Sequence, residues 1–224
     1  MGLIIKNKMY GQIHLDTNKI IGIMGKNSSV VTDSLNRNMV SFVSKDYEFY
    51  TNSCMTELMI HLKKVNTSEL TDLLKMFDLD EYFLKKKIND LSSGEKKILK
   101  YLIAFLENKK NIFIDEPFLD IDFKWKKCLI SFFKRTIYEK NKTIFIVSNN
   151  SNIIYELCDM ILLLEKEYVY GTVRDIFTNT MLLEKYHIDI PNIVEFVNLA
   201  KKKKVLIDYS YDIRDLIKDV YKHV

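Results

Sequence analysis

Five short apolar runs, each bounded by turn-forming or charged residues, divide the chain into segments of strand length. Their apolar residues are nearly continuous, which is typical of strands buried on both faces of a sheet. The predicted strands cover residues 19–24, 39–44, 111–115, 143–148 and 160–165. The stretches near 94–108, 123–138 and 151–158 have helical patterns. This alternation predicts an α/β fold with a mostly parallel sheet.

Two segments depart from the alternation. Residues 53–90 carry apolar side chains at helical spacing and indicate an inserted helical subdomain at about residues 51–94. After Gly171 the pattern is helical to the end of the sequence. We therefore expect a core domain over residues 1–170 and a C-terminal helical extension over residues 171–224.

Composition narrows the class of protein. The 224 residues are 47% hydrophobic and 29% charged, which is enough to bury a full core. The net charge of +4 is mild and the lysines are spread along the chain, so nucleic-acid binding is not expected. Three widely spaced cysteines suit a reducing compartment and neither a disulfide framework nor a zinc site. No apolar run has the length of a secretory signal or a membrane helix, which predicts a soluble protein.

The sequence GIMGKNSSV follows the first predicted strand and partly matches the phosphate-binding loop G-x-x-x-x-G-K-[ST]. Gly22 takes the position of the first glycine, and Ser29 takes the hydroxyl position. Asn27 and Ser28 stand where the template has its second glycine and its lysine. Either this is an altered nucleotide site or it is an ordinary tight turn. The candidate nucleotide-binding residues of the loop are Gly22, Gly25, Lys26, Asn27, Ser28 and Ser29.

Two further motifs carry candidate chemistry. The sequence Ser92-Ser93-Gly94-Glu95 begins a predicted helix and matches an S-x-x-E capping box, and such a helix start can also bind an anion. Asp115 and Glu116 end a predicted buried strand, at the edge where open α/β sheets place ligands. Asp115 can hold Mg²⁺ through water and Glu116 can polarise an attacking water, unless both acids only cap the next turn.

Together, in order and spacing, these motifs resemble those of the ABC ATPase family. LSSGE resembles the LSGGQ signature, IFIDEP resembles Walker B with its catalytic glutamate, and the segment that ends in Asp122 resembles the D-loop. The resemblance implies a P-loop ATPase core that binds ATP and Mg²⁺. It implies a metal site at Ser29 and Asp115 and a catalytic role for Glu116.

The same resemblance shows where the chain departs from the family. Lys45 stands at the position of the Q-loop glutamine, and Asn149 stands at the catalytic switch histidine. The aromatic residue that stacks on adenine has no convincing counterpart, because Tyr10 is too close to Gly22. The Lys45 ammonium could neutralise Asp115 and stand in for the metal or for the missing loop lysine, or Lys45 could be an ordinary surface lysine.

The C-terminal part of the chain resembles the tail of energy-coupling-factor (ECF) transporter ATPases, in which the tail contributes to pairing of two ATPase subunits. This resemblance implies a second ATPase subunit, an ECF-type transmembrane coupling subunit and a substrate-binding membrane subunit as partners. It implies a place at the cytoplasmic face of the membrane and import of a vitamin or metal ion. The matching residues are Gly171, Thr172, Phe177, Leu182, Leu183, Asp189 and Pro191.

In this family two ATPase domains pack head to tail and share each nucleotide between them. The substitutions at Asn27, Ser28, Lys45 and Asn149 all fall on the chain's own site, whereas the partner's site keeps Ser92, Gly94 and Asp122. Our main hypothesis is that the chain is the degenerate half of a heterodimer and supplies its signature motif to an intact partner. The alternatives are a non-hydrolysing scaffold, the ATPase of another ABC transporter class, and a non-transport ABC protein.

Overall fold

A six-stranded sheet forms the centre of the computed structural model, which describes residues 3–29, 31, 40–62, 64–205, 207–210 and 213–223. The strands lie in the order β4-β5-β6-β3-β7-β8, and β8 is antiparallel to β7 while the other pairs are parallel. The predicted parallel α/β sheet is confirmed, although residue 39 of the second predicted strand lies outside the described residues. The strands are β3 (Ile20–Met24), β4 (Val40–Val43), β5 (Asn111–Asp115), β6 (Thr143–Val147), β7 (Met160–Leu164) and β8 (Tyr168–Thr172).

Side chains of the sheet alternate between two apolar layers. In β5, Ile112 and Ile114 face one layer, whereas Phe113 faces the other and stacks on Phe145 of β6 at 4.3 Å between ring centroids. Because both faces are covered, the strand sequences are continuously apolar.

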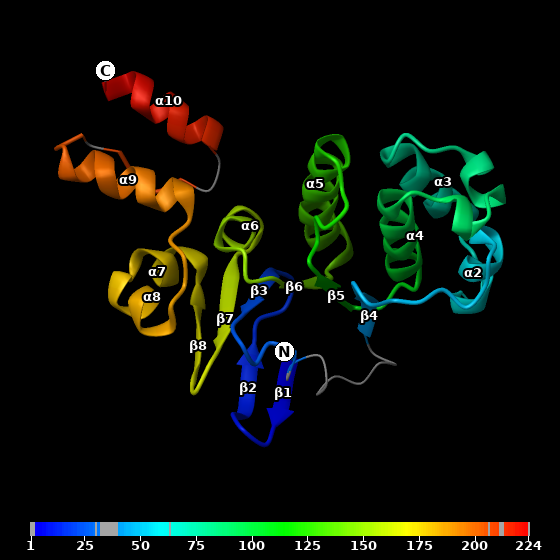
Figure 1. Cartoon of the computed structure of the whole chain (residues 1–224), viewed down its shortest axis with the longest axis horizontal. Coiled ribbons are helices and arrows are strands. Elements are labelled where there is room, and N and C mark those ends of the chain that lie inside the picture. The colour runs from blue at the N-terminus through cyan, green and yellow to red at the C-terminus, as the bar shows by residue number, and fades with distance from the viewer. Residues whose placement is uncertain are drawn as a thin grey trace.

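Helices cover one face of this sheet and a separate hairpin lies at the other (Figure 1). The hairpin pairs β1 (Leu3–Asn7) with β2 (Gly11–Leu15) and buries Ile5 and Ile13. The helices are α4 (Ser93–Leu106), α5 (Phe123–Lys140) and α6 (Ser151–Leu157), as the sequence predicts. The hairpin was not predicted, because few of its side chains are apolar and buried.

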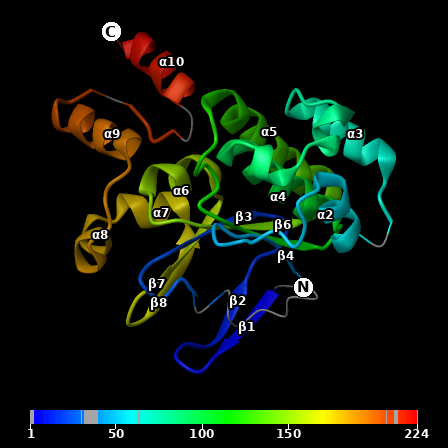
Figure 2. The ribbon, with the colours of Figure 1, turned by 45° about the vertical axis from the view of Figure 1, so that its right-hand side comes forward.

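Two groups of helices flank the core on opposite sides, and the two views agree on this arrangement (Figures 1 and 2). Beside α4 lie α2 (Cys54–His61) and α3 (Thr67–Met76), with the short 3-10 helices η1 (Glu81–Lys85) and η2 (Ile88–Asp90). The other group contains α7 (Val173–Thr178), α8 (Thr180–Tyr186), α9 (Asn192–Lys202) and α10 (Ile213–His223). No helix in the described part of the chain is both long and apolar enough to span a membrane.

Candidate functional site

The candidate residues gather where three neighbouring parallel strands end. The ends of β3, β5 and β6 are aligned, since Val147 lies opposite Ile23 on one side and Asp115 on the other. The Ser148 N–H donates to the carbonyl of Ile23 at 3.2 Å, and the Glu116 N–H donates to the carbonyl of Val147 at 2.9 Å. Residues 25–29, 115–117 and 148–150 therefore share one edge of the sheet, where ligands bind in open α/β folds.

Gly25 sets the conformation of the loop after β3. Its φ of +110° is disfavoured for other residues, and a Cβ atom there would lie 2.4 Å from the carbonyl oxygen of Leu164. The turn that follows Gly25 is held to the end of β7, because the Asn27 N–H donates to the Leu164 carbonyl at 3.2 Å. The loop is thus built tightly against the end of β7.

Successive backbone amides of this loop already have acceptors within the protein. The Gly25 N–H donates to Oδ1 of Asn149 at 3.0 Å, and the Lys26 N–H donates to Oε1 of Glu165 at 3.1 Å. The Ser28 N–H donates to the carbonyl of Gly25 at 3.2 Å. In phosphate-binding loops such amides point at the bound anion. Here a side-chain amide and a carboxylate of the chain itself accept from two of them.

The Asn27 side chain joins the loop to Tyr10 and to the backbone of Glu165. Its Nδ2 donates to the Tyr10 hydroxyl at 2.9 Å and to the Glu165 carbonyl at 2.9 Å. The Tyr10 hydroxyl in turn donates to the same carbonyl, and the Tyr10 ring packs edge-on against Tyr168. On sequence grounds Tyr10 is rejected as the residue that stacks on adenine. In the structure Tyr10 contacts the loop through its hydroxyl.

Sequence reasoning missed Glu165 as a residue of this site. The signal was available, because Glu165 ends the predicted strand 160–165 and parallel neighbours end at the same edge. What the sequence does not give is that β7 pairs with β3, which brings Glu165 next to Lys26.

The two acids after β5 lie at this edge. Glu116 has a φ of +45°, and its Oε2 accepts a hydrogen bond from Oγ of Ser148 at 3.0 Å. From the other side, Nζ of Lys97 donates to the carbonyl oxygens of Asp115 and Glu116 at 3.0 and 3.1 Å. Burial, followed by the neighbouring Lys100 charge, lowers the pKa of Lys97 to about 8, while the nearby carboxylates of Asp115, Asp120 and Glu116 oppose the shift.

The residues available for Mg²⁺ are few. Among the described residues, no group of three or more His, Cys, Asp and Glu side chains could hold a metal ion. Protein sites for Mg²⁺ commonly use one or two carboxylates and complete the octahedron with substrate phosphates and waters. The oxygen atoms of Asp115 and Ser29 are suitable Mg²⁺ ligands, but only together with further ligands from nucleotide phosphates and water.

Lys45 does not pair with Asp115 in this structure. The Lys45 carbonyl accepts a hydrogen bond from Nζ of Lys100 at 3.3 Å. Within the described residues, no ion pair joins the Lys45 ammonium to Asp115. The structure therefore does not bring together the two groups that the compensation hypothesis requires.

The predicted capping box at the start of α4 is confirmed. Oγ of Ser92 accepts from the Glu95 N–H at 3.2 Å, and Oε2 of Glu95 accepts from the Ser92 N–H at 2.9 Å. Nζ of Lys86 holds the other Glu95 oxygen at 2.7 Å. The hydrogen bond from Lys86, followed by that from the Ser92 amide, lowers the pKa of Glu95. The Ser92 hydroxyl acts here as an acceptor, so its proton is available to a ligand.

The start of α4 packs closely on the segment before α5. A Cβ atom on Gly94 would lie 2.8 Å from the Asp120 carbonyl oxygen and 3.1 Å from the Trp125 ring. Two residues on, Oδ1 of Asp122 caps α5 by accepting from the Trp125 N–H at 2.8 Å. The predicted signature residues, including the exposed Ser93, and Asp122 thus lie on adjoining elements.

Comparison with solved structures places this arrangement in a known fold. The structure of an ATP-binding subunit of an ABC transporter superposes with a TM-score of 0.70 at 17% identity, covering 85% of this chain and 99% of that one. The fold is that of an ABC ATPase domain. The parallel sheet, the flanking helices and the strand ends described above are therefore elements of an ABC ATPase fold.

Curated relatives agree with the ABC ATPase fold. The energy-coupling factor transporter ATP-binding protein EcfA3 of Oenococcus oeni is 25% identical over 163 residues, covering 71% of this chain and 56% of the relative. The EcfA2 protein of Spiroplasma kunkelii is 25% identical over 199 residues, covering 84% of this chain and 65% of the relative. The chain is thus similar to ABC transporter ATP-binding proteins and spans less than two thirds of the length of each of these two. No family model matches the sequence.

Proposed function

We propose that the chain is an ATP-binding subunit of an ECF-type ABC transporter that imports a vitamin or metal ion, and that it is the degenerate half of an ATPase heterodimer. Similarity to energy-coupling factor ATPases supports the transporter class. The chain would lend its α4 start to a partner whose own phosphate loop is intact.

The observation that carries the asymmetric role is the set of acceptors on the loop amides. Asn149 and Glu165 accept from the Gly25 and Lys26 amides, which a phosphate would otherwise use. Ser28 also replaces the lysine that would contact the β- and γ-phosphates. A charge-assisted hydrogen bond contributes about 1.5–3 kcal/mol, so its loss weakens nucleotide binding by roughly one to two orders of magnitude.

The surface that would contribute to the partner's site keeps the groups that such a role requires. The start of α4 presents backbone N–H groups and the positive end of the helix dipole, both of which favour an anion. The Ser92 hydroxyl retains a proton to donate. Asp122 lies on the adjoining element as the N-cap of α5. In this proposal the start of α4 binds the γ-phosphate of a nucleotide held by the partner.

At the chain's own site, the residues would mainly hold ligands and backbone groups in place and would not move protons. Asp115 and Ser29 would hold Mg²⁺, which supplies charge neutralisation for the phosphates when it is bound. Glu116, whose carboxylate accepts from Ser148 at 3.0 Å, would contact water at this site without contributing to turnover of the pair. Asn149, which has no titratable ring, holds a loop amide in place of moving a proton.

We further propose that residues 1–170 form the ATPase domain, with a helical subdomain at about 51–94, and that residues 171–224 form an extension that pairs the two subunits. The coupling and substrate-binding membrane subunits would then hold the pair at the cytoplasmic face of the membrane.

ATP hydrolysis by the reconstituted pair tests the asymmetric role. The chain and its intact partner subunit are assayed as wild type, with Ser92→Arg and with Glu116→Gln in this chain. We expect Ser92→Arg to abolish turnover, because the bulky cation enters the partner's phosphate site, and Glu116→Gln to leave turnover unchanged. Loss of activity in Glu116→Gln would mean that this chain's own site works.

A non-hydrolysing scaffold is the second candidate function, and the internal acceptors of the loop amides favour it too. The same assay separates the two. If Ser92→Arg leaves turnover of the pair unchanged while the pair still assembles, the chain contributes no signature motif and acts as a scaffold.

A further inference from the structure

One face of α4 holds the backbone of the segment between β5 and α5. Lys97 and Tyr101 are four residues apart and therefore lie on the same face of the helix. Nζ of Lys97 donates to the carbonyl oxygens of Asp115 and Glu116 at 3.0 and 3.1 Å. The Tyr101 hydroxyl donates to the Pro117 carbonyl at 2.6 Å. Three consecutive carbonyl groups of the segment thus accept hydrogen bonds from two side chains of α4.

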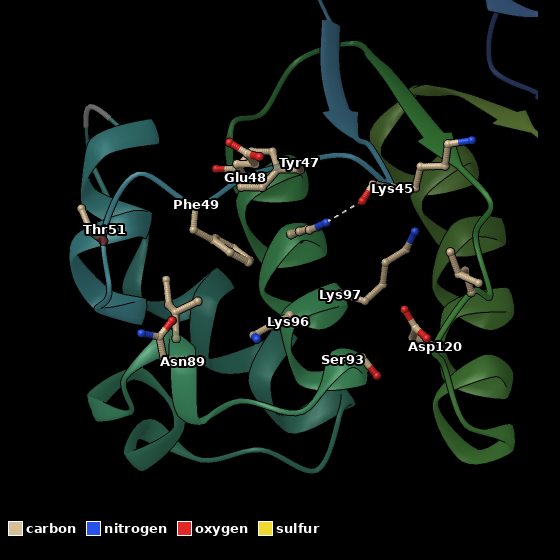
Figure 3. A pocket seen from close by; sticks show the side chains of 13 residues that line it. Lys45, Tyr47, Glu48, Phe49, Thr51, Asn89, Ser93, Lys96, Lys97 and Asp120 are labelled. Carbon is tan, nitrogen blue, oxygen red and sulfur yellow. Dashed lines mark hydrogen bonds between the residues drawn. The ribbon is translucent and has the colours of Figure 1, made fainter.

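The Lys97 side chain is directed at this segment and is buried there. Figure 3 shows it leaving α4 on the side where Asp120 lies, whereas the neighbouring Lys96 points in another direction. Lys97 is 4% exposed, and an ammonium group at such depth is costly unless hydrogen bonds and opposite charges surround it. The two carbonyls supply the hydrogen bonds, and the carboxylates of Asp115, Asp120 and Glu116 attract the ammonium electrostatically. The charge of Lys97 is therefore compensated within the protein.

The segment that Lys97 holds has an unusual backbone. Glu116 and Asp120 have φ angles of +45° and +63°, in the left-handed region that residues other than glycine rarely adopt. Such conformations cost free energy and persist only where the surrounding contacts impose them. The Glu116 carbonyl accepts from the Leu119 N–H of its own turn at 3.2 Å and from Nζ of Lys97 at 3.1 Å. Lys97 thus fixes the oxygen on which this turn closes.

The same contacts connect two groups that have proposed roles at the partner's nucleotide. Lys97 lies four residues after Ser93, which is about one helical turn, or roughly 6 Å along the axis of α4. Beyond the other end of the held segment, Oδ1 of Asp122 caps α5 by accepting from the Trp125 N–H. The spacing between the start of α4 and Asp122 therefore depends on how firmly the segment is held to α4.

We propose that Lys97, assisted by Tyr101, is a positioning residue that holds residues 115–120 on α4, so that the start of α4 and Asp122 keep a fixed spacing at the partner's nucleotide. The role assigned to Lys97 rests on the asymmetric function proposed above. Lys97 does not touch the nucleotide in this arrangement, because its ammonium is buried and its acceptors belong to the chain's own backbone. Its loss acts on the turnover rate rather than on nucleotide affinity, since the partner's loop binds the nucleotide.

Amide hydrogen exchange of the full chain tests the positioning directly. Lys97→Met keeps most of the unbranched apolar side chain and removes the donors. We expect the amides of residues 117–122, including the hydrogen-bonded amides of Leu119 and Ile121, to exchange about tenfold faster in this variant, with the amides of β6 unchanged. Lys142→Met is the matched control, because Lys142 is 3% exposed and its Nζ has no hydrogen-bond partner among the described residues. Exchange in the segment should then stay as in the wild type.

ATP hydrolysis by the pair of this chain and its intact partner subunit tests the consequence for the reaction. We expect Lys97→Met to lower kcat by about tenfold and to change the KM for ATP by less than about twofold. Lys97→Gln, whose amide N–H groups can donate to the same carbonyls, should recover kcat to within about threefold of the wild type. Lys142→Met should leave both constants unchanged. Tyr101→Phe removes only a hydroxyl and should lower kcat by about threefold, which keeps the test valid if Lys97→Met does not fold.

Each other outcome has a definite meaning. Unchanged exchange of residues 117–122 in Lys97→Met overturns the proposal, and so does a kcat no lower than that of Lys142→Met. A rise in KM at unchanged kcat, or a loss that Lys97→Gln does not recover, also overturns it and leaves Lys97 with a structural role only. If Ser92→Arg leaves turnover unchanged, the proposed function itself fails. If Ser92→Arg abolishes turnover and Lys97→Met does not lower it, only the role of Lys97 fails.

Discussion

At the scale of single residues, the main feature of the loop after β3 is that its backbone amides already donate hydrogen bonds to side chains of the same chain. Glu165 supplies a carboxylate to the Lys26 N–H, and Asn149 supplies an amide oxygen to the Gly25 N–H. A carboxylate and a phosphate compete for such amides by the same electrostatic attraction. If the loop binds nucleotide as proposed, the internal carboxylate would therefore compete with it.

Removing that carboxylate is expected to raise nucleotide binding. In Glu165→Ala the Lys26 amide becomes available, so saturating Mg·ATP should raise the melting temperature by about 2–4 °C, equivalent to roughly 1 kcal/mol in a chain of this size. In the wild type we expect a shift below about 1 °C. Thermal unfolding with and without Mg·ATP measures the difference.

The matched control is Glu167→Ala, which removes an exposed carboxylate of the same turn that forms a long ion pair of 3.7 Å with Lys185. It should behave as the wild type does. Equal nucleotide stabilisation of the wild type and Glu165→Ala would show that the internal carboxylate does not compete.

At the scale of elements, the close contact between α4 and the segment before α5 fixes the surface proposed to face the partner. Gly94 permits this contact, since any side chain there would meet the Asp120 carbonyl. Gly94 is therefore required by packing within this chain, in addition to any role that it has as the glycine of the predicted signature.

Gly94→Ala should lower the free energy of unfolding by about 1–3 kcal/mol, because overpacking against backbone outweighs the gain in helix propensity of about 1 kcal/mol. Urea denaturation measures the change. Gly171→Ala is the control, since its Cβ would meet Ile176 at an ordinary 3.6 Å. A Gly94→Ala variant as stable as that control would show that the two elements separate easily.

Elements were more predictable from the sequence than contacts between them. The five strands of the parallel sheet and the helices α4, α5 and α6 follow from long apolar patterns. The β1–β2 hairpin was missed because its register leaves only Ile5, Ile13 and Leu15 buried. The contacts of Tyr10 with Asn27 and of Glu165 with Lys26 were missed because they join residues 17 and 139 positions apart, which local periodicity does not encode.

At the scale of the whole molecule, a buried carboxylate joins the segment after β4 to the helices beside α4. Glu57 of α2 has a fully buried side chain and accepts from the Tyr47 hydroxyl at 2.8 Å. It also accepts from the amides of Tyr50 and Thr51 at 3.2 and 2.9 Å. Glu57 thus adds buried hydrogen bonds to the apolar packing that holds this helical group against the core.

We expect Glu57→Ala to destabilise the protein by about 2–4 kcal/mol, because it leaves buried amides without acceptors. Glu57→Gln keeps one acceptor oxygen and should lose about half as much. Urea denaturation of both variants tests the order. If Glu57→Gln is as damaging as Glu57→Ala, the charge of the carboxylate rather than its hydrogen bonds holds the two parts together.

Glu165 and the loop belong to the same chain, and this affects how the proposed pair would respond to the ATP concentration. A tethered acceptor has a fixed effective concentration, so it would raise the apparent dissociation constant of the loop for nucleotide by a constant factor, and at ATP concentrations well below that constant the loop would stay without nucleotide. Only the partner's loop would then register the energy state of the cell. Such a pair would hydrolyse ATP with a hyperbolic dependence on concentration, whereas two coupled nucleotide sites can give a sigmoidal one.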